Sequence, residues 1–302
     1  MTTLVVGTRA STLALVQTEQ VLALLRAAHP RTEFEVRHIS TRGDRITDRP
    51  LVELGRNGVF VTEIEAALRS REINLAVHSA KDLPSRLAPD MRIGAFLARE
   101  DPRDVLVSRA GPLGALPPGA RVGTSSPRRA AQLRALRSDL QLADVRGNVD
   151  TRLRRLAEGG YDALVLAAAG LVRLGRAAEI TEWLSPDVML PAVGQGALAI
   201  EVRAGDQPIV DLVTPLHHPP TGFAVAAERA FLAELGGDCT AAVGALGSIG
   251  AGGKLYLTGM ISGDDGRLIR GDAEGAPGDA SLGASLARRL REATATAGTR
   301  VP

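Results

Sequence analysis

The chain has 302 residues, an apolar fraction of 45% and a formal net charge of +2 at pH 7. This composition indicates a folded protein of two or three domains and argues against intrinsic disorder. The small net charge and the aromatic content of 3% argue against a nucleic-acid partner. A single cysteine, Cys239, excludes an internal disulfide and a zinc site built from several thiolates.

The N-terminal sequence lacks the features of an export signal. No basic segment precedes an apolar run, and no later stretch approaches the roughly twenty apolar residues of a membrane helix. We therefore predict a cytoplasmic protein without a membrane partner. No metal site is predicted, because the adjacent His217 and His218 precede two prolines and are poorly spaced for two ligands on one face.

The first half begins with a strand, a glycine turn and a helix. Apolar residues 4–6 lead into Gly7, and apolar residues with helical spacing follow from 13 to 25. Ser11 or Thr12 can cap this helix, whose first N–H groups then form an anion site. The pattern next predicts a second strand over 34–39, a helix over 63–68 and a third strand over 74–83.

The same order of elements returns in the second half of the chain. The pattern predicts a strand over 120–124, a helix that begins near Pro127, a strand over 140–145, a helix over 151–156 and a strand over 162–171. Aligning the two halves places Lys81 and Asp82 opposite Ala169 and Gly170. We therefore predict a duplicated scaffold in which only the first half carries an acid–base group.

This alternation of strands and helices predicts an α/β fold. Two lobes with mixed sheets would flank a cleft, with ligands at the carboxyl ends of the strands. An extended segment over 190–201 would return from the second lobe to the first, and the residues after Pro220 would form a small α+β domain. The predicted domains are a first lobe of 1–98 with 199–217, a second lobe of 99–198 and a C-terminal domain of 218–302.

Cations and hydroxyls gather at the predicted strand ends. Arginine forks pair well with carboxylate or phosphate, so the set predicts a ligand with several anionic groups. The alternative is solvated arginines on helix faces, which we accept for Arg134, Arg137, Arg154 and Arg155. Neither half carries a P-loop or a Gly-x-Gly-x-x-Gly motif after its first strand, which disfavours a nucleotide cofactor. The set consists of Arg9, Ser11, Thr124, Ser125, Ser126, Arg128, Arg129, Arg146, Arg152 and Arg173.

Asp82 ends an apolar strand and is the candidate acid–base group. A carboxylate at such a strand end can face a cleft, although a structural ion pair with Lys81 is the alternative. His78 points to the other side of the strand from Ser79 and is predicted to be a core histidine. Cys239 is either an inert filler, which numbers alone favour, or a reactive thiol.

Taken together, the motifs resemble the hydroxymethylbilane synthase (porphobilinogen deaminase) family. The resemblance runs in order from about residue 4 to 245 and is carried by residues 6–11, 76–84, 99–104, 122–129, 146–153, 190–197 and 227–230, with Cys239 after them. It implies two lobes like those of periplasmic binding proteins, a monomer, and a dipyrromethane cofactor attached to Cys239 by a thioether.

The resemblance also implies a reaction and a role for each residue. Such a transferase condenses four porphobilinogen units onto the cofactor and releases hydroxymethylbilane by hydrolysis, in tetrapyrrole (haem) biosynthesis. Asp82 would be catalytic, assisting loss of ammonia and stabilising the resulting cation. The cofactor would be held by Lys81, Ser126, Arg128, Arg129 and Arg146. The substrate would be bound by Arg9, Ser11, Phe60, Thr124, Ser125, Arg152, Arg173 and Gln195.

Three features depart from the family pattern. Asn57 stands in the glycine-rich loop 55–60 where relatives commonly carry lysine, Pro127 replaces the usual leucine, and the cofactor loop 236–244 has Asp238 before the cysteine and lacks the commoner Gly-Cys-x-x-Pro-x-Gly pattern.

Two other classes of protein and an inactive family member share parts of the pattern. A binding protein for anionic metabolites would use the same arginines but would need neither Asp82 nor Cys239. A regulatory module would bring a partner-recognition segment, which the sequence does not show, whereas an inactive family member would keep the motifs.

Overall fold

The computed structural model describes residues 3–45, 61–236, 242–263 and 265–298. Asn57, Phe60 and Cys239 therefore lie outside the described residues. The contacts between residues divide the chain into two compact units, of which the first comprises 1–100 with 197–222 and the second 101–196 with 223–302.

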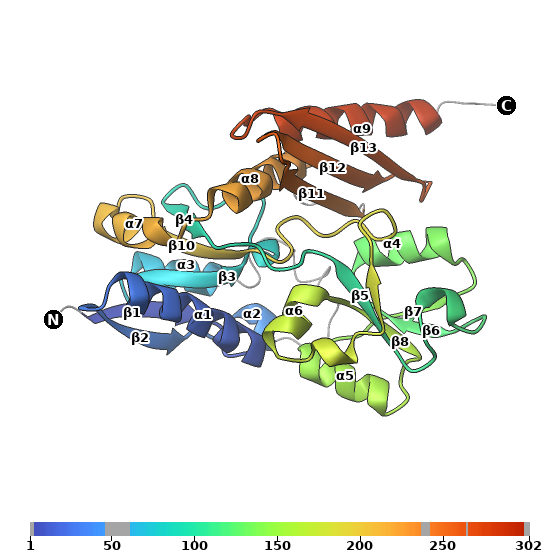
Figure 1. The fold of residues 1–302 in the computed structure, drawn as a ribbon, viewed down its shortest axis with the longest axis horizontal. Coiled ribbons are helices and arrows are strands. Elements are labelled where there is room, and N and C mark those ends of the chain that lie inside the picture. Colours follow the sequence, from blue (N-terminus) through green and yellow to red (C-terminus); the bar gives the residue numbers. More distant parts are fainter. Residues whose placement is uncertain (1–2, 46–60, 237–241, 264, 299–302) are drawn as a thin grey trace. The chain divides into compact units, whose positions relative to one another are not determined.

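The first unit is built on a five-stranded mixed sheet with the order β2-β1-β3-β10-β4 (Figure 1). Its strands are β1 (Thr3–Thr8), β2 (Glu33–His38), β3 (Leu75–Ser79), β4 (Met91–Phe96) and β10 (Leu198–Arg203). Strand β1 runs parallel to β2 and β3, whereas β10 runs antiparallel to β3 and β4. The helical elements are α1 (Thr12–Ala28), α2 (Arg42–Arg45), α3 (Thr62–Arg69), α7 (Gln207–Val213) and the 3-10 turns η1 (Ala80–Asp82) and η4 (Thr214–Leu216).

Helices cover both faces of this sheet. Val77 packs with residues of α1 and α7, whereas its neighbour Ala76 packs with residues of α3. Successive side chains of a strand point to opposite faces, so a strand that is buried on both faces has an uninterrupted apolar sequence. This is why residues 75–77 are continuously apolar and buried.

The second unit repeats this arrangement with a sheet of the order β7-β6-β8-β5-β9. Its strands are β5 (Asp104–Ser108), β6 (Arg121–Gly123), β7 (Gln141–Ala143), β8 (Ala163–Ala167) and β9 (Glu182–Leu184). The helical elements are α4 (Pro127–Leu136), α5 (Val149–Ala157), α6 (Ala168–Arg173) and the 3-10 turns η2 (Leu113–Ala115) and η3 (Ala177–Glu179). The strand directions match those of the first sheet, because β6 is parallel to β7 and β8 while β5 is antiparallel to β8 and β9.

The register of the two sheets confirms the predicted alignment of the halves. Val6 of β1 lies opposite Leu75, and Val122 of β6 lies opposite Ala163. Counting onward from these pairs, Asp82 after β3 corresponds to Gly170 after β8. The repeated scaffold therefore places a carboxylate at this edge in the first unit and a glycine in the second.

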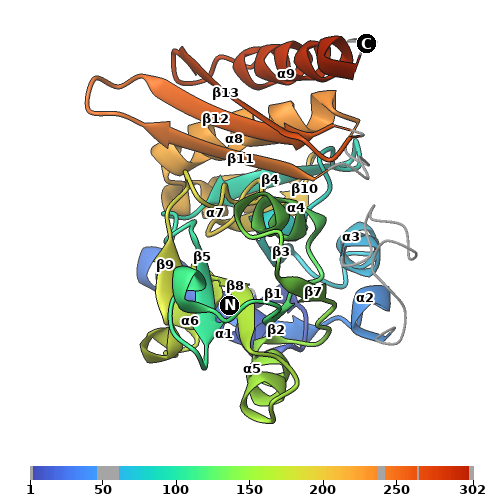
Figure 2. The same ribbon diagram turned by 90° about the vertical axis from the view of Figure 1, so that its right-hand side faces the viewer.

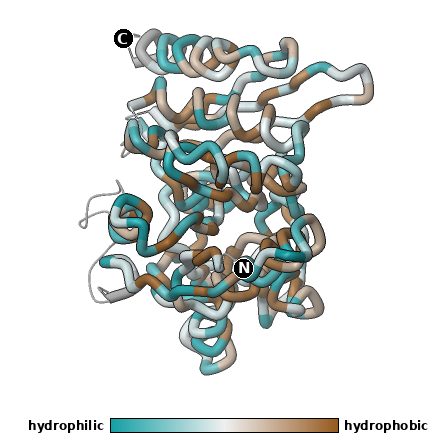
Figure 3. The backbone as a smooth tube through the Cα atoms, turned by 90° about the vertical axis from the view of Figure 1, so that its left-hand side faces the viewer, coloured by the Kyte–Doolittle hydropathy of each residue, from teal (hydrophilic) through white to brown (hydrophobic). Residues whose placement is uncertain are grey.

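The second unit also contains a three-stranded antiparallel sheet near the C-terminus. Its strands are β11 (Val243–Ile249), β12 (Leu255–Ser262) and β13 (Leu268–Gly275). Its helices are α9 (Leu282–Gly298) and α8 (Pro219–Glu234), which belongs to this unit from Phe223 onward. Helix α9 packs along β12 and β13 (Figure 2). Figure 3 shows the mixture of hydrophilic and hydrophobic residues along α9, whose Leu286 and Leu290 are buried. The predictions of an α/β fold with mixed sheets and of a small C-terminal α+β domain are confirmed.

Replacing Gly283 by alanine is expected to lower the free energy of unfolding by about 1–3 kcal/mol. An added Cβ would overlap the carbonyl oxygen of Ala227 and lie 2.7 Å from the amide nitrogen of Phe231, so α8 and α9 would have to separate. The helix preference of alanine over glycine, about 1 kcal/mol, acts in the opposite direction. Urea denaturation measures the change, with Gly252→Ala as the control because nothing lies within 4 Å of its added Cβ. An unchanged midpoint for Gly283→Ala would contradict this account.

Candidate functional site

The first unit brings Arg9, Ser11, Lys81 and Asp82 to one edge of its sheet. Strands β1 and β3 are parallel neighbours, so the loop after β1 and the turn η1 after β3 leave the sheet on the same side. Ser11 is the N-cap of α1 and its hydroxyl accepts a hydrogen bond from the amide of Ala14 at 3.4 Å, which confirms the predicted cap. The loop between β1 and this cap carries Arg9.

Asp82 lies beside Arg9 and remains accessible. The distance from Arg9 Nη1 to Asp82 Oδ2 is 3.8 Å, and the two side chains are 22% and 35% exposed. A carboxylate with this exposure can contact a substrate directly, and the adjacent guanidinium can bind a carboxylate of the same ligand. The geometry therefore suits acid–base chemistry on an anionic substrate.

His78 has the structural role that the alternation of β3 predicts. It is buried, and its Nε2 lies 2.9 Å from Oε2 of Glu201 on the neighbouring strand β10. Glu201 is itself fully buried. The prediction of a core histidine is confirmed, and its carboxylate partner was not predicted.

The second unit uses its hydroxyls to shape the turn after β6. Ser126 is the N-cap of α4 and accepts from the amide of Arg129 at 3.4 Å, and Pro127 occupies the first turn as predicted. Thr124 Oγ1 accepts from the amide of Ser126 at 3.2 Å. Ser125 Oγ donates to the carbonyl of Val145 at 2.9 Å and accepts from its amide at 3.0 Å. These hydroxyls therefore fix the loops at the ends of β6 and β7.

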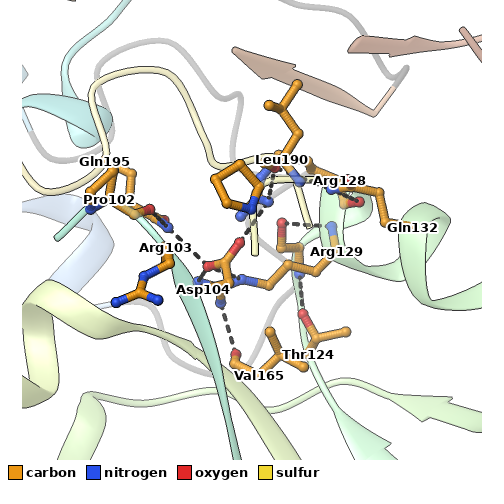
Figure 4. Close-up of polar contacts among 12 residues, drawn as sticks. Pro102, Arg103, Asp104, Thr124, Arg128, Arg129, Gln132, Val165, Leu190 and Gln195 are labelled. Atoms are coloured by element: carbon orange, nitrogen blue, oxygen red, sulfur yellow. Dashed lines mark hydrogen bonds and ion pairs between the residues drawn. The ribbon is translucent and has the colours of Figure 1, made fainter. Parts of the chain in front are cut away.

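Arg128 and Arg129 converge on a carboxylate for which the sequence analysis had no role (Figure 4). Arg128 Nη1 lies 2.7 Å from Asp104 Oδ2, and Arg129 Nη2 lies 2.6 Å from Asp104 Oδ1. Gln195 Nε2 donates to the same Oδ1 at 2.9 Å. The guanidiniums also donate to backbone carbonyls, those of Leu190 and Val165 respectively.

Burial makes this cluster electrostatically unusual. Asp104 is fully buried, and Arg128 and Arg129 are 5% and 7% exposed. We call Asp104, Arg128 and Arg129 the triad. Its one carboxylate and two guanidiniums give it a net charge of +1. Burial alone raises the pKa of the Asp104 carboxyl, but attraction from Arg128 and Arg129 outweighs it and leaves that pKa well below its usual range. Burial lowers the pKa of Arg128, against the opposing effect of Asp104.

The other predicted arginines of the second unit lie on the elements that follow its parallel strands. Arg152 on α5 donates from Nε to the carbonyl of Gly147 at 2.8 Å. Arg173 on α6 donates from Nη2 to the carbonyl of Gly196 at 2.8 Å. Arg146 follows β7 and is half-buried. Asn148, which follows it, caps α5 by accepting from the amide of Thr151 at 2.9 Å.

Within each unit, the parallel strands thus bring the predicted residues to the carboxyl edge of the sheet. The donors are guanidinium, ammonium and hydroxyl groups, which fit a ligand or cofactor that carries several carboxylates. No group of three or more His, Cys, Asp or Glu that could hold a metal ion occurs in the described ranges. None of the helices described combines the length and apolar character needed to cross a membrane. Phe60 and Cys239 lie outside the described residues.

Three acidic residues in the described part of the chain, Asp104, Glu201 and Glu228, are fully buried and were missed by sequence reasoning. Asp104 directly precedes the apolar residues 105–107, Glu201 interrupts an apolar strand, and Glu228 interrupts an apolar helix. A carboxylate inside an apolar segment is rarely buried without a partner. This is the sequence signal that could have singled them out, although it does not identify their partners.

Comparison with protein families and curated relatives gives one consistent result. The family model for the porphobilinogen deaminase dipyromethane cofactor binding domain matches residues 4–211, and that for the porphobilinogen deaminase C-terminal domain matches residues 223–292. The chain is 57% identical to the porphobilinogen deaminase of Roseiflexus castenholzii over 292 residues, which cover 96% of each chain. It is 51% identical to that of Thermus thermophilus over 295 residues, covering 97% of this chain and 96% of the relative.

Among solved structures, a periplasmic and an extracellular binding protein show a more distant similarity. A TRAP periplasmic solute binding protein from Desulfovibrio salexigens has a TM-score of 0.42 and 10% identity, covering 71% of this chain and 72% of that one. A probable amino-acid ABC transporter extracellular-binding protein from Bacillus subtilis has a TM-score of 0.40 and 13% identity, covering 72% of this chain and 90% of that one.

Proposed function

Because the chain belongs to the porphobilinogen deaminase family, we propose that it condenses porphobilinogen units into hydroxymethylbilane with Asp82 as its catalytic carboxylate. The enzyme is a transferase of tetrapyrrole biosynthesis, and its cofactor is dipyrromethane. The observation that carries the assignment of Asp82 is its position at the carboxyl end of β3, partly exposed and 3.8 Å from Arg9.

Dipyrromethane, when bound, supplies the nucleophilic pyrrole carbon to which new units are added. We propose that dipyrromethane is attached covalently to Cys239, the only cysteine of the chain. Each pyrrole carries an acetate and a propionate, and the donors of the second unit suit such groups. The residues proposed to hold the cofactor are Lys81, Ser126, Arg128, Arg129 and Arg146. Those proposed to bind the substrate are Arg9, Ser11, Phe60, Thr124, Ser125, Arg152, Arg173 and Gln195.

The chemical task of Asp82 follows from the substrate. The aminomethyl group of porphobilinogen reacts in its protonated form. Its C–N bond breaks, the electron pair of that bond stays with the nitrogen, and the nitrogen leaves as neutral ammonia. The remaining pyrrole carries a positive charge that is shared with its N–H group. A carboxylate beside it stabilises that charge and accepts a hydrogen bond from the N–H. Arg9, adjacent to Asp82, orients a carboxylate of the same ring.

The attachment at Cys239 predicts a covalent mass increase. Purified wild-type protein is expected to be heavier than its sequence by one dipyrromethane, whereas Cys239→Ser is expected to have the mass of its sequence alone. Intact-mass spectrometry measures both, and a pyrrole-specific colour test gives an independent readout. Because the variant would lack the bound cofactor, it also loses the stabilisation that a ligand gives the folded state, so its thermal midpoint is expected to fall.

A wild-type protein that has the bare mass, and keeps it after incubation with porphobilinogen, would overturn the proposal of a covalent cofactor. A wild-type mass increase that persists in Cys239→Ser would overturn only the attachment point.

Two further proposals are that the protein acts in the cytoplasm and that it is a monomer without a nucleic-acid partner. Light scattering on the purified protein measures its molar mass in solution, which should be that of one chain, 31.6 kDa.

A further inference from the structure

Glu228 is a fully buried carboxylate on α8 that binds two backbone segments of the second unit. Its Oε2 accepts a hydrogen bond from the amide of Gly194 at 2.6 Å, and its Oε1 accepts one from the amide of Gly247 at 2.8 Å. A buried carboxylate is costly unless it is well satisfied, and bonds between a charged acceptor and N–H groups are stronger than neutral ones. The two oxygens therefore fix the distance between these segments.

The first segment leads directly to the arginine cluster. Gly194 is followed by Gln195, whose Nε2 donates to Asp104 and to the carbonyl of Pro102. Asp104 in turn binds Arg128 and Arg129. A shift of Gly194 would therefore move Gln195 and with it one of the donors that hold the Asp104 carboxylate.

The second segment belongs to the C-terminal sheet. Gly247 lies in β11, the first strand after Cys239 in the sequence. The same strand also approaches the residues before Gly194, because the amide of Ala245 donates to the carbonyl of Pro191 at 3.1 Å. A Cβ at Gly244 would lie 3.0 Å from that carbonyl oxygen, so the two segments touch through their backbones. Because a close-packed interior transmits strain, a shift of residues 191–194 would also displace β11.

We propose that Glu228 is a positioning residue that sets the register of β11 against Gln195 and the arginine cluster around Asp104. In doing so it fixes β11, the strand that follows Cys239 in the sequence, relative to Arg128 and Arg129 of the same unit. The inference rests on the proposed function, in particular on attachment at Cys239. Neither the family motifs nor the predicted donor set assigns this role.

Glu228→Gln is the sharpest test, because glutamine has the same shape but only one acceptor oxygen. The two amides need two acceptors, and the new amide group would face one of these N–H groups. The control is Glu182→Gln, since Glu182 also accepts a backbone hydrogen bond in this unit, from Leu113 at 2.6 Å, and lies on β9, which pairs with β5 in the other sheet of the unit. Glu228→Asp, which keeps the charge but is shorter, is made in parallel in case Glu228→Gln is recovered unfolded.

Four quantities are measured on each full-length protein. They are the thermal midpoint, hydrogen exchange of the peptides that contain Gly194 and Gly247, the rate at which the covalent cofactor is acquired during incubation with porphobilinogen, and turnover per loaded molecule. We expect faster exchange in both peptides and about a ten- to hundredfold loss in loading rate or in turnover per loaded molecule, as for a displaced reacting group. Glu182→Gln should remain within about twofold of wild type in loading and turnover, as its carboxylate lies outside this network.

A merely structural role gives a different result. In that case the thermal midpoint falls and exchange accelerates, but loading and turnover per loaded molecule match wild type in the Glu228 variants that fold. This outcome would overturn the inference and leave the proposed function intact. If wild type itself acquires no covalent cofactor, the proposed attachment at Cys239 fails instead, and the inference fails with it.

Discussion

Asp82→Asn is expected to slow porphobilinogen consumption by about 10²–10⁴-fold, the usual contribution of a positioned acid–base group. Asparagine keeps the shape of the side chain but loses the negative charge that stabilises the cation formed as ammonia departs. The Asp82 side chain is 35% exposed and its contact with Arg9 is long, at 3.8 Å. The free energy of unfolding should therefore change by no more than about 0.5 kcal/mol, as for most surface substitutions. Initial rates with purified protein, together with thermal unfolding, measure both.

The matched control is Asp90→Asn. Asp90 is also an exposed aspartate of the first unit, and its Oδ2 accepts a hydrogen bond from Arg69 at 2.7 Å. Its place is just before β4, near the beginnings rather than the carboxyl ends of β1 and β3. Asp90→Asn should therefore leave turnover unchanged. Turnover in Asp82→Asn within about tenfold of wild type would argue against a catalytic carboxylate at this position.

Much of the scaffold could be predicted because its signals are local. The strand–turn–helix patterns after Val6 and Val122 depend on residues close together in the sequence, and so do the caps Ser11 and Ser126. Even the correspondence of Asp82 with Gly170 is local, since it needs only the spacing from each strand to the turn after it. The carboxyl edge of each sheet then gathers the predicted cations without further information.

The arginine cluster could not be predicted, because its partners are distant in the sequence. Arg129 was expected to present its guanidinium to a ligand, yet that group binds Asp104, which lies 25 positions earlier. Gln195 reaches the same carboxylate from 91 positions later. Nothing in the sequence near Arg129 indicates these contacts, which depend on β5 lying beside β8 in the sheet. Whether Arg128 and Arg129 also bind cofactor carboxylates stays a prediction.

The triad makes Asp104→Asn the substitution with the largest expected effect on stability. Removing one partner of a buried ion pair typically costs about 3–5 kcal/mol, because the remaining charge stays buried and uncompensated. Here two guanidiniums would remain, and the new amide group would bring N–H donors against at least one of them. Chemical denaturation at pH 7 measures the loss. Asp139→Asn is the control, since Asp139 pairs with Arg137 on the surface.

The pH dependence gives this prediction a second, independent test. The folded pKa of Asp104 lies well below its usual range, so its contribution to stability is complete above the unfolded pKa of about 4. As the pH falls below that value, the unfolded chain takes up a proton that the folded chain does not, and the contribution is progressively lost. The difference in unfolding free energy between wild type and Asp104→Asn should therefore be constant from neutral pH down to about 5 and shrink below about 4. A difference that stays the same through this range would mean that Asp104 has the same pKa in the folded and unfolded chains, whereas a wild type that gains stability as the pH falls from 7 to about 4 would mean that the folded carboxyl is protonated. Either result would contradict the ion-pair description of the cluster.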